Sequence, residues 1–194
     1  MRPCQIFLLA LGSASLVSSC GSGLYCPNAK TDLVKLSPET RQWFTYVPKQ
    51  TIRFRDEAGN VDTLTVAQLS DTVENYWQGD ECPDRPQEVV RVRLVHPATA
   101  DTIIMSGEFT NQLSIAKAPL LLTYFTNTHK IFPDNQPSYY SYSANVAVGT
   151  EIFSQVLTIR CPPCEPNLIN ELYIAEKTGV VAYRRQTKLW IKER

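Results

Sequence analysis

Residues 50–66 read QTIRFRDEAGNVDTLTV, and this stretch decides the fold class. Apolar and polar side chains alternate with a period of two in residues 50–55 and again in 61–66, as they do in strands that bury one face. Between them, Glu57-Ala58-Gly59-Asn60 supplies residues that favour a turn. We therefore predict a β-hairpin. Its expected core-facing side chains are Ile52, Phe54, Leu64 and Val66.

Strand signals continue toward the C-terminus. Short segments rich in β-branched and aromatic residues are separated by Pro, Gly, Asn and Asp at spacings typical of all-β domains. For the last segment we predict three antiparallel strands, because Lys177-Thr178-Gly179 marks a turn and residues 180–184 are β-rich; a helix capped by Asn167 is the alternative. The other predicted strands are residues 89–95, 102–106, 113–115, 120–125, 139–148 and 152–159.

One short helix precedes the hairpin. Ser37-Pro38-Glu39-Thr40 combines an N-cap serine, a proline at the first helical position and an acidic residue in the first turn. Trp43-Phe44 can then pack inward, and Pro48 stops the helix. The predicted fold is mainly β: a single antiparallel sheet or sandwich, or a partly open barrel, with one short N-terminal helix.

The composition indicates one globular domain. The chain has 194 residues, of which 43% are hydrophobic and 20% charged. Lys and Arg number 19, against 19 Asp and Glu, and no basic stripe is present, so nothing in the sequence supports nucleic-acid binding. Apart from the N-terminus, no apolar stretch is long enough to span a bilayer.

The N-terminal twenty residues have the layout of a signal peptide. Arg2 precedes the apolar run from Ile6 to Leu11, and small residues dominate from Gly12 to Ser19. The apolar core is too short for a transmembrane helix, and the small residues suit a cleavage site. A buried first helix or strand of the domain is the alternative.

Leu16-Val17-Ser18-Ser19-Cys20 resembles the lipobox of bacterial lipoproteins. The resemblance implies cleavage between Ser19 and Cys20, a diacylglycerol thioether on the Cys20 thiol and usually a further acyl chain, such as palmitate, on the new amine. Two or more acyl chains anchor a protein stably to a membrane. Gly21 stands where an aspartate would retain some lipoproteins at the inner membrane, so the implied location is the outer membrane of the bacterial cell envelope. The expected parts are residues 1–19 as signal peptide, 20–36 as lipidated cysteine and tether, and 37–194 as one β-rich domain.

The mature part is similar to small uncharacterised bacterial lipoproteins in two places. One is the C-terminal ending, with Tyr173-Ile174-Ala175, Gly179-Val180-Val181 and Trp190. The other is the stretch 36–66, where a Trp-containing helix precedes a hairpin. Members of that group are β-rich and have no assigned activity, so the resemblance bears on the fold and leaves the specific role and the partner open.

Four cysteines remain once Cys4 has left with the signal peptide and Cys20 carries lipid. They are Cys26, Cys82, Cys161 and Cys164, an even number that predicts disulfides in an exported protein, with three possible pairings. Pro162-Pro163 favours an extended backbone that would hold its flanking cysteines too far apart for a mutual bond. A distant partner is therefore preferred, unless the two prolines form a turn.

Cys161-Pro162-Pro163-Cys164 also permits a thiol-disulfide redox function. Only residues 165–194 follow the motif, too few for the helices and strands of a thioredoxin fold, and Arg160 replaces the usual tryptophan. A zinc site formed by the four cysteines ranks lower, because thiols pair with each other in an oxidising compartment. We predict no metal and no cofactor.

Two further groups of residues could carry function. His96 and His129 are the only candidate bases near neutral pH, and as isolated histidines both are expected at the surface. A tyrosine cluster could form a glycan-binding platform, although alternating tyrosines also simply suit a pleated strand. No Gly-x-Ser-x-Gly elbow, His-Glu-x-x-His helix or phosphate-binding Gly-rich loop occurs, so these motifs give enzymatic activity no positive support. The cluster consists of Tyr139, Tyr140 and Tyr142, with Tyr76 and Trp77.

Overall fold

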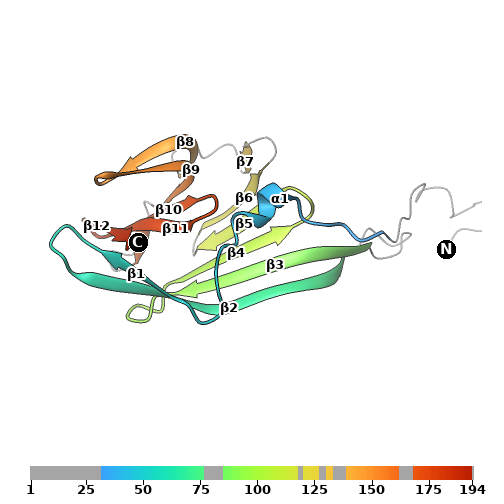
Figure 1. Ribbon diagram of the computed structural model, residues 1–194, viewed down its shortest axis with the longest axis horizontal. Coiled ribbons are helices and arrows are strands. Elements are labelled where there is room, and N and C mark those ends of the chain that lie inside the picture. Colours follow the sequence, from blue (N-terminus) through green and yellow to red (C-terminus); the bar gives the residue numbers. More distant parts are fainter. Residues whose placement is uncertain are drawn as a thin grey trace, which may run out of the picture.

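A computed structural model (Figure 1) describes residues 32–76, 85–117, 120–126, 130–132, 139–161 and 168–193. The fold is mainly β with one short helix, as predicted from the sequence. The helix is α1 (Pro38–Arg41). The strands are β1 (Thr51–Arg55), β2 (Val61–Tyr76), β3 (Arg85–Val95), β4 (Thr102–Glu108), β5 (Gln112–Lys117), β6 (Leu120–Phe125), β7 (Lys130–Phe132), β8 (Tyr140–Val148), β9 (Glu151–Arg160), β10 (Ile169–Ala175), β11 (Gly179–Arg185) and β12 (Lys188–Lys192).

These strands form one antiparallel sheet that curls into a half-barrel (Figure 1). Its order is β7-β6-β5-β4-β3-β2-β1-β12-β11-β10-β9-β8. The first seven strands run outward from β1 to one edge, and β8 starts the opposite edge, from which the chain returns until β12 pairs with β1. Two meanders therefore meet along β1, and strands that are consecutive in sequence, β7 and β8, form the two edges.

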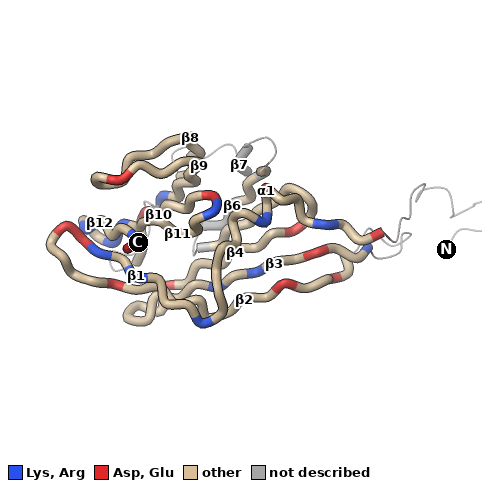
Figure 2. The backbone as a smooth tube through the Cα atoms, in the orientation of Figure 1, with Lys and Arg blue, Asp and Glu red and all other residues tan. Residues whose placement is uncertain are grey.

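The predicted hairpin is β1 and β2, paired with Ile52 opposite Leu64. Beyond the predicted end of the second strand, β2 passes an irregularity between Val66 and Gln68 and continues to Tyr76. There it pairs with β3, and the two strands form a long arm (Figure 1). In this arm β2 contributes acidic side chains, and β3 contributes three arginines and Glu88, so charges of both signs lie side by side (Figure 2).

Apolar side chains and the segment after α1 fill the concave face of the half-barrel. The Ser37 hydroxyl accepts a hydrogen bond from the Thr40 N–H at 3.1 Å, the N-cap that the sequence predicts. Trp43 is 1% exposed and its ring meets that of Tyr124 edge to face, with centroids 5.3 Å apart. The main core draws buried side chains from both meanders, and this shared core joins them into one domain.

Tyr46 fastens the same segment to the turn between β10 and β11. Its hydroxyl accepts a hydrogen bond from the Val180 N–H at 2.9 Å and donates one to Met105 Sδ at 3.5 Å. Gly179 has a φ of +75°, and a Cβ at that position would lie 2.6 Å from the Tyr46 oxygen. The glycine is therefore required both by its backbone conformation and by the close approach of the tyrosine.

A second, smaller cluster lies on the opposite face of β10–β12. It contains Val156, Tyr173 and Val181, with Leu189 and Ile191 packed against it. The turn between β8 and β9 covers this cluster: a Cβ on Gly149 would lie 2.5 Å from Ile191 Cδ1, although β8 and β12 are separated in the sheet by three strands. The β8–β9 hairpin therefore folds back over the convex face of its own sheet.

The described chain begins beside the far end of the arm (Figure 1). Val34 forms a parallel bridge with Gln87, its N–H donating to Pro86 O at 2.9 Å. Arg85 Nε donates to Asp32 O at 3.3 Å. These contacts hold residues 32–36 against β3 before α1 begins. Within the described parts of the chain, no helix combines the length and apolar character needed to cross a bilayer.

Candidate functional site

Most of the residues that the sequence singles out lie outside the described part of the chain. Among them are the signal-peptide junction at Ser19 and Cys20, and the histidine His129. Of the four cysteines predicted to form disulfides, Cys161 is described: it is 2% exposed and disulfide-bonded. Its possible partners, Cys26, Cys82 and Cys164, lie outside the described residues, so the pairing stays a prediction.

The tyrosine cluster does not form one exposed platform among the described residues. Tyr140 is 5% exposed and belongs to the main core, and Tyr142 stacks on Tyr124 with ring centroids 5.5 Å apart. Tyr76 lies on the arm, where its ring meets Phe109 at 4.7 Å. Trp77 lies outside the described residues. These tyrosines pack as residues of a pleated sheet, the alternative interpretation of their pattern.

His96 lies at the end of β3, and its predicted surface position is wrong: it is fully buried. Its Nε2 lies 2.9 and 3.0 Å from the two Asp62 carboxylate oxygens. On the other side of the ring, Nδ1 lies 3.2 Å from the backbone nitrogen of Thr99 and 3.0 Å from its hydroxyl. A buried polar group requires such partners, and β2 and the β3–β4 turn supply them.

The contacts of the ring assign its tautomer. A backbone N–H can only donate, so His96 Nδ1 accepts from Thr99, and in the neutral ring the proton sits on Nε2, facing Asp62. Because Nδ1 already accepts, it is unavailable as a base for the Thr99 hydroxyl. The arrangement therefore supports positioning, not nucleophilic catalysis.

The buried pair positions Arg185 through the carboxylate of Asp62, whose Oδ2 accepts from Arg185 Nη2 at 2.7 Å. Arg185 Nη1 also lies beside His96 Nε2, but both nitrogens carry protons in this tautomer, so no hydrogen bond joins them. The guanidinium carbon also lies 5.6 Å from the centre of the Trp190 ring, a cation–π distance. Asp62 of β2, supported by His96 just after β3, thus holds one cation of β11 whose side chain is 22% exposed.

Asp62 stays ionised although its side chain is largely buried. Burial alone would raise the pKa of its carboxyl, but the hydrogen bonds from His96 and from the Thr63 N–H outweigh burial and lower it. Burial, and then the negative charge of Asp62, raise the pKa of Tyr183. The cluster therefore holds an ionised aspartate beneath Arg185 and a neutral phenol beside it.

A pocket of about 680 Å³ opens above this cluster at the rim of the half-barrel. Two cations, Arg185 and Lys188, line it, and no carboxylate is among its described lining residues. The Trp190 side chain also lines the pocket; it is 5% exposed, and its Nε1 has no hydrogen-bond partner among the described residues. The remaining lining residues are Ala98, Thr99, Leu168 and Gln186.

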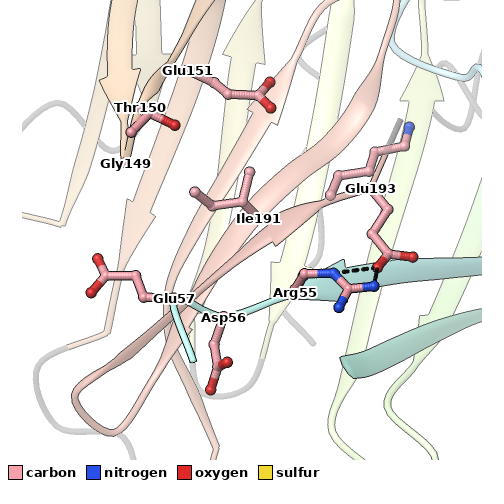
Figure 3. Close-up of a pocket in the computed structure, with 9 residues that line it drawn as sticks. Arg55, Asp56, Glu57, Gly149, Thr150, Glu151, Ile191 and Glu193 are labelled. Carbon is pink, nitrogen blue, oxygen red and sulfur yellow. Dashed lines mark hydrogen bonds and ion pairs between the residues drawn. The ribbon is translucent and has the colours of Figure 1, made fainter. Parts of the chain in front are cut away.

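A second pocket, of about 830 Å³, lies on the convex side under the turn of the folded-back hairpin (Figure 3). Thr150 and Glu151 come from that turn, Ile191 lies between the walls, and Arg55 binds Glu193 opposite, with Nε to Oε1 at 2.8 Å (Figure 3). Of its two cations, Arg55 is paired with Glu193 and Lys192 donates to Thr178 O at 2.9 Å, and its other charged groups are acidic. The geometry gives no converging set of groups that would select a ligand.

The rim cluster is the functional candidate that the sequence analysis missed. Asp62 and Arg185 are 123 positions apart by their numbers, and no local pattern connects them. One local signal was present: in His96-Pro97-Ala98-Thr99, the threonine three residues after the histidine suits a turn in which its hydroxyl and N–H bind the ring. That signal predicts a buried histidine instead of a solvated one.

No group of three or more His, Cys, Asp or Glu side chains with metal-binding geometry occurs within the described residues. The chain matches no protein-family model, no curated protein and no solved structure.

Proposed function

We propose that the chain is a lipoprotein of the bacterial cell envelope, anchored through Cys20 at the outer membrane, with its β domain as a structural or binding component. The observation that carries the proposal is the sequence Leu16-Val17-Ser18-Ser19-Cys20 after a short apolar run. This order suits processing of a lipoprotein signal peptide and provides an anchor without a transmembrane helix.

The position of the first described residues is compatible with such an anchor. Asp32 and Val34 lie at the far end of the β2–β3 arm, and the chain between Cys20 and Asp32 could reach at most about 40 Å when extended. A lipid on Cys20 would therefore keep this end of the arm within about 40 Å of the membrane. The mixed charges of the arm provide no basic patch to attract anionic lipid, so the acyl chains would have to hold the protein (Figure 2).

Mass spectrometry of the protein purified from bacterial membranes tests the proposal. We expect a mature chain that begins at Cys20 and carries a diacylglyceryl group, with a further acyl chain on its amine. Cys20→Ala should leave the protein unlipidated and in the soluble fraction. Cys26→Ala is the matched control, because it removes a neighbouring cysteine and should keep the lipid.

A wild-type chain that begins at Met1, carries no acyl group and washes out with the soluble fraction would contradict the proposal. The same spectrum, taken without reductant, identifies the cysteine bonded to Cys161. A bond to Cys26 or Cys82 would match the expectation of a distant partner. A bond to Cys164 would mean that the two prolines turn.

A further inference from the structure

We propose that the pocket at the rim of the half-barrel binds a small molecule through an oxyanion, a carboxylate or a phosphate, held by Arg185 and Lys188 beside the ring of Trp190. The inference goes beyond the envelope anchoring proposed above and does not depend on it.

The first argument is the character of the pocket lining. Among the described lining residues, the charged groups are the cations Arg185 and Lys188. The pocket therefore offers mainly hydrogen-bond donors, without a described carboxylate to repel an anion. Donors that converge on one space match the acceptor oxygens of a carboxylate or phosphate.

The second argument is the indole ring of Trp190. The ring lines the pocket, and both cations lie over it, with Arg185 Cζ 5.6 Å and Lys188 Nζ 5.9 Å from the ring centre. These cation–π distances place the two positive charges at the same pocket.

The third argument is that the guanidinium of Arg185 is fixed before any ligand arrives. Asp62 holds Nη2 at 2.7 Å, and Asp62 is itself held by the Nε2–H of His96 at 2.9 and 3.0 Å. A guanidinium has five N–H donors, so these contacts leave others for a ligand. Since the side chain is already ordered, binding costs less conformational entropy than it would with a freely moving arginine.

Lys188 supplies the second charge at the same indole ring. Its Nζ lies 5.9 Å from the Trp190 ring centre, and its nearest carboxylate, Asp56, is 3.5 Å away. The Asp56 carboxylate also accepts two hydrogen bonds from Asn60, at 2.7 and 2.8 Å. Because Asp56 is thus satisfied without it, Lys188 can turn toward an anion at little cost.

Nuclear magnetic resonance of the indole N–H groups tests the proposal directly. The chain has three tryptophans, and Trp190→Phe identifies the signal of Trp190 in the ¹⁵N spectrum of the full-length chain. Inorganic phosphate and acetate are the probes, each titrated to about 50 mM at constant ionic strength adjusted with chloride, so that screening does not change. We expect a saturable shift of the Trp190 signal with a dissociation constant on the order of millimolar. Tighter binding of one probe identifies the oxyanion.

Variants separate the pocket from general ionic effects. Lys188→Gln, at an exposed position, should weaken binding severalfold, and Arg185→Gln should weaken it at least about tenfold, because bidentate charge-assisted bonds are the strong ones. Arg184→Gln is the matched control: Arg184 neighbours Arg185 in β11, is bound to Glu171 and does not line the pocket.

The proposal is overturned if the Trp190 signal shows no saturable shift with either probe. It is equally overturned if Lys188→Gln binds the probe as tightly as the wild-type chain and Arg184→Gln do. Lys188→Gln keeps the test decisive even where Arg185→Gln unfolds, since Lys188 is half-exposed and takes no part in the buried cluster. The two proposals are independent: failure of anion binding says nothing about the lipid on Cys20, and absence of the lipid says nothing about the pocket.

Discussion

The two meanders of this sheet are built from the same kind of strand but are buried differently. In the first, β1 alternates between exposed and buried side chains over its whole length. In the second, five consecutive residues of β11, Gly179 to Tyr183, are buried. The cause is the β8–β9 hairpin, which folds back over the convex face and gives that half a second core. One sheet can thus be solvated on its outer face in one half and covered there in the other, by its own edge strands.

The largest effect should come from the concave core, which both halves share. Trp43→Ala removes a side chain that is 1% exposed, and we expect a loss of about 3–5 kcal/mol in the free energy of unfolding. Urea unfolding followed by circular dichroism measures it. Val47→Ala, in the same segment but 61% exposed, should change stability by less than about 0.5 kcal/mol. Similar losses in both variants would mean that the segment after α1 does not fill the half-barrel.

The folded-back hairpin is tested by a pair of glycines. Gly149→Val and Gly59→Val both place a β-branched residue at a positive φ, which costs about 1–3 kcal/mol in each case. Only at Gly149 does the new Cβ overlap a neighbour, Ile191 at 2.5 Å; at Gly59 the nearest atom is 4.0 Å away. Gly149→Val should therefore lose about 1–3 kcal/mol more than Gly59→Val. If urea unfolding shows the same loss of stability in both variants, the contact between the β8–β9 hairpin and the sheet is contradicted.

The second core itself is tested by removing the same two methyl groups in each half. Val181→Ala in β11 removes them from a fully buried side chain, and Val61→Ala in β2 from one that is 44% exposed. At about 0.8 kcal/mol per buried carbon, we expect a loss near 1.5 kcal/mol for Val181 and less than about 0.5 kcal/mol for Val61. Midpoints of urea unfolding that coincide for the two variants would show that the halves are not buried differently.

The smallest effect should come from the arm, where stabilisation is electrostatic and exposed. The hydrogen bond and charge of Arg91 lower the pKa of Glu74. A lowered pKa contributes stability that is present above the unfolded value, about 4.3, and is lost as the pH falls through the folded value. Glu74→Gln should cost less than about 1 kcal/mol at pH 7 and should make stability less dependent on pH in acid. Unfolding at pH 7 and pH 3 measures both; an unchanged acid dependence would contradict the assignment.

The sequence predicted where the strands of this fold lie better than it predicted which of their faces are buried. Period-two alternation located β1 and the start of β2, and turn residues located the C-terminal meander, including the glycine turn at Gly179. The second half of β2 was missed, because the irregularity between Val66 and Gln68 shifts the register and the residues beyond it lack an apolar alternation. Period-two alternation predicts a strand only as long as the register of its pairing does not shift.

The covered convex face and the rim pocket could not be predicted from the sequence. Continuous apolar residues in β11 are compatible with burial on both faces, but nothing local says that the β8–β9 turn is the cover. Asp62, His96 and Arg185 come from three strands and meet only because β2 lies between β1 and β3 while β11 closes on the same rim. Contacts of this kind depend on topology, which single-sequence patterns do not contain.

Proton–proton contacts in solution test the central claim most directly, namely that the β8–β9 hairpin covers its own sheet. We predict a nuclear Overhauser cross-peak between Gly149 Hα and the Ile191 δ-methyl group, together with slow amide exchange at Val181 and Ala182. Absence of that cross-peak, with amides of Val181 and Ala182 exchanging as fast as those at the end of the arm, would contradict the account.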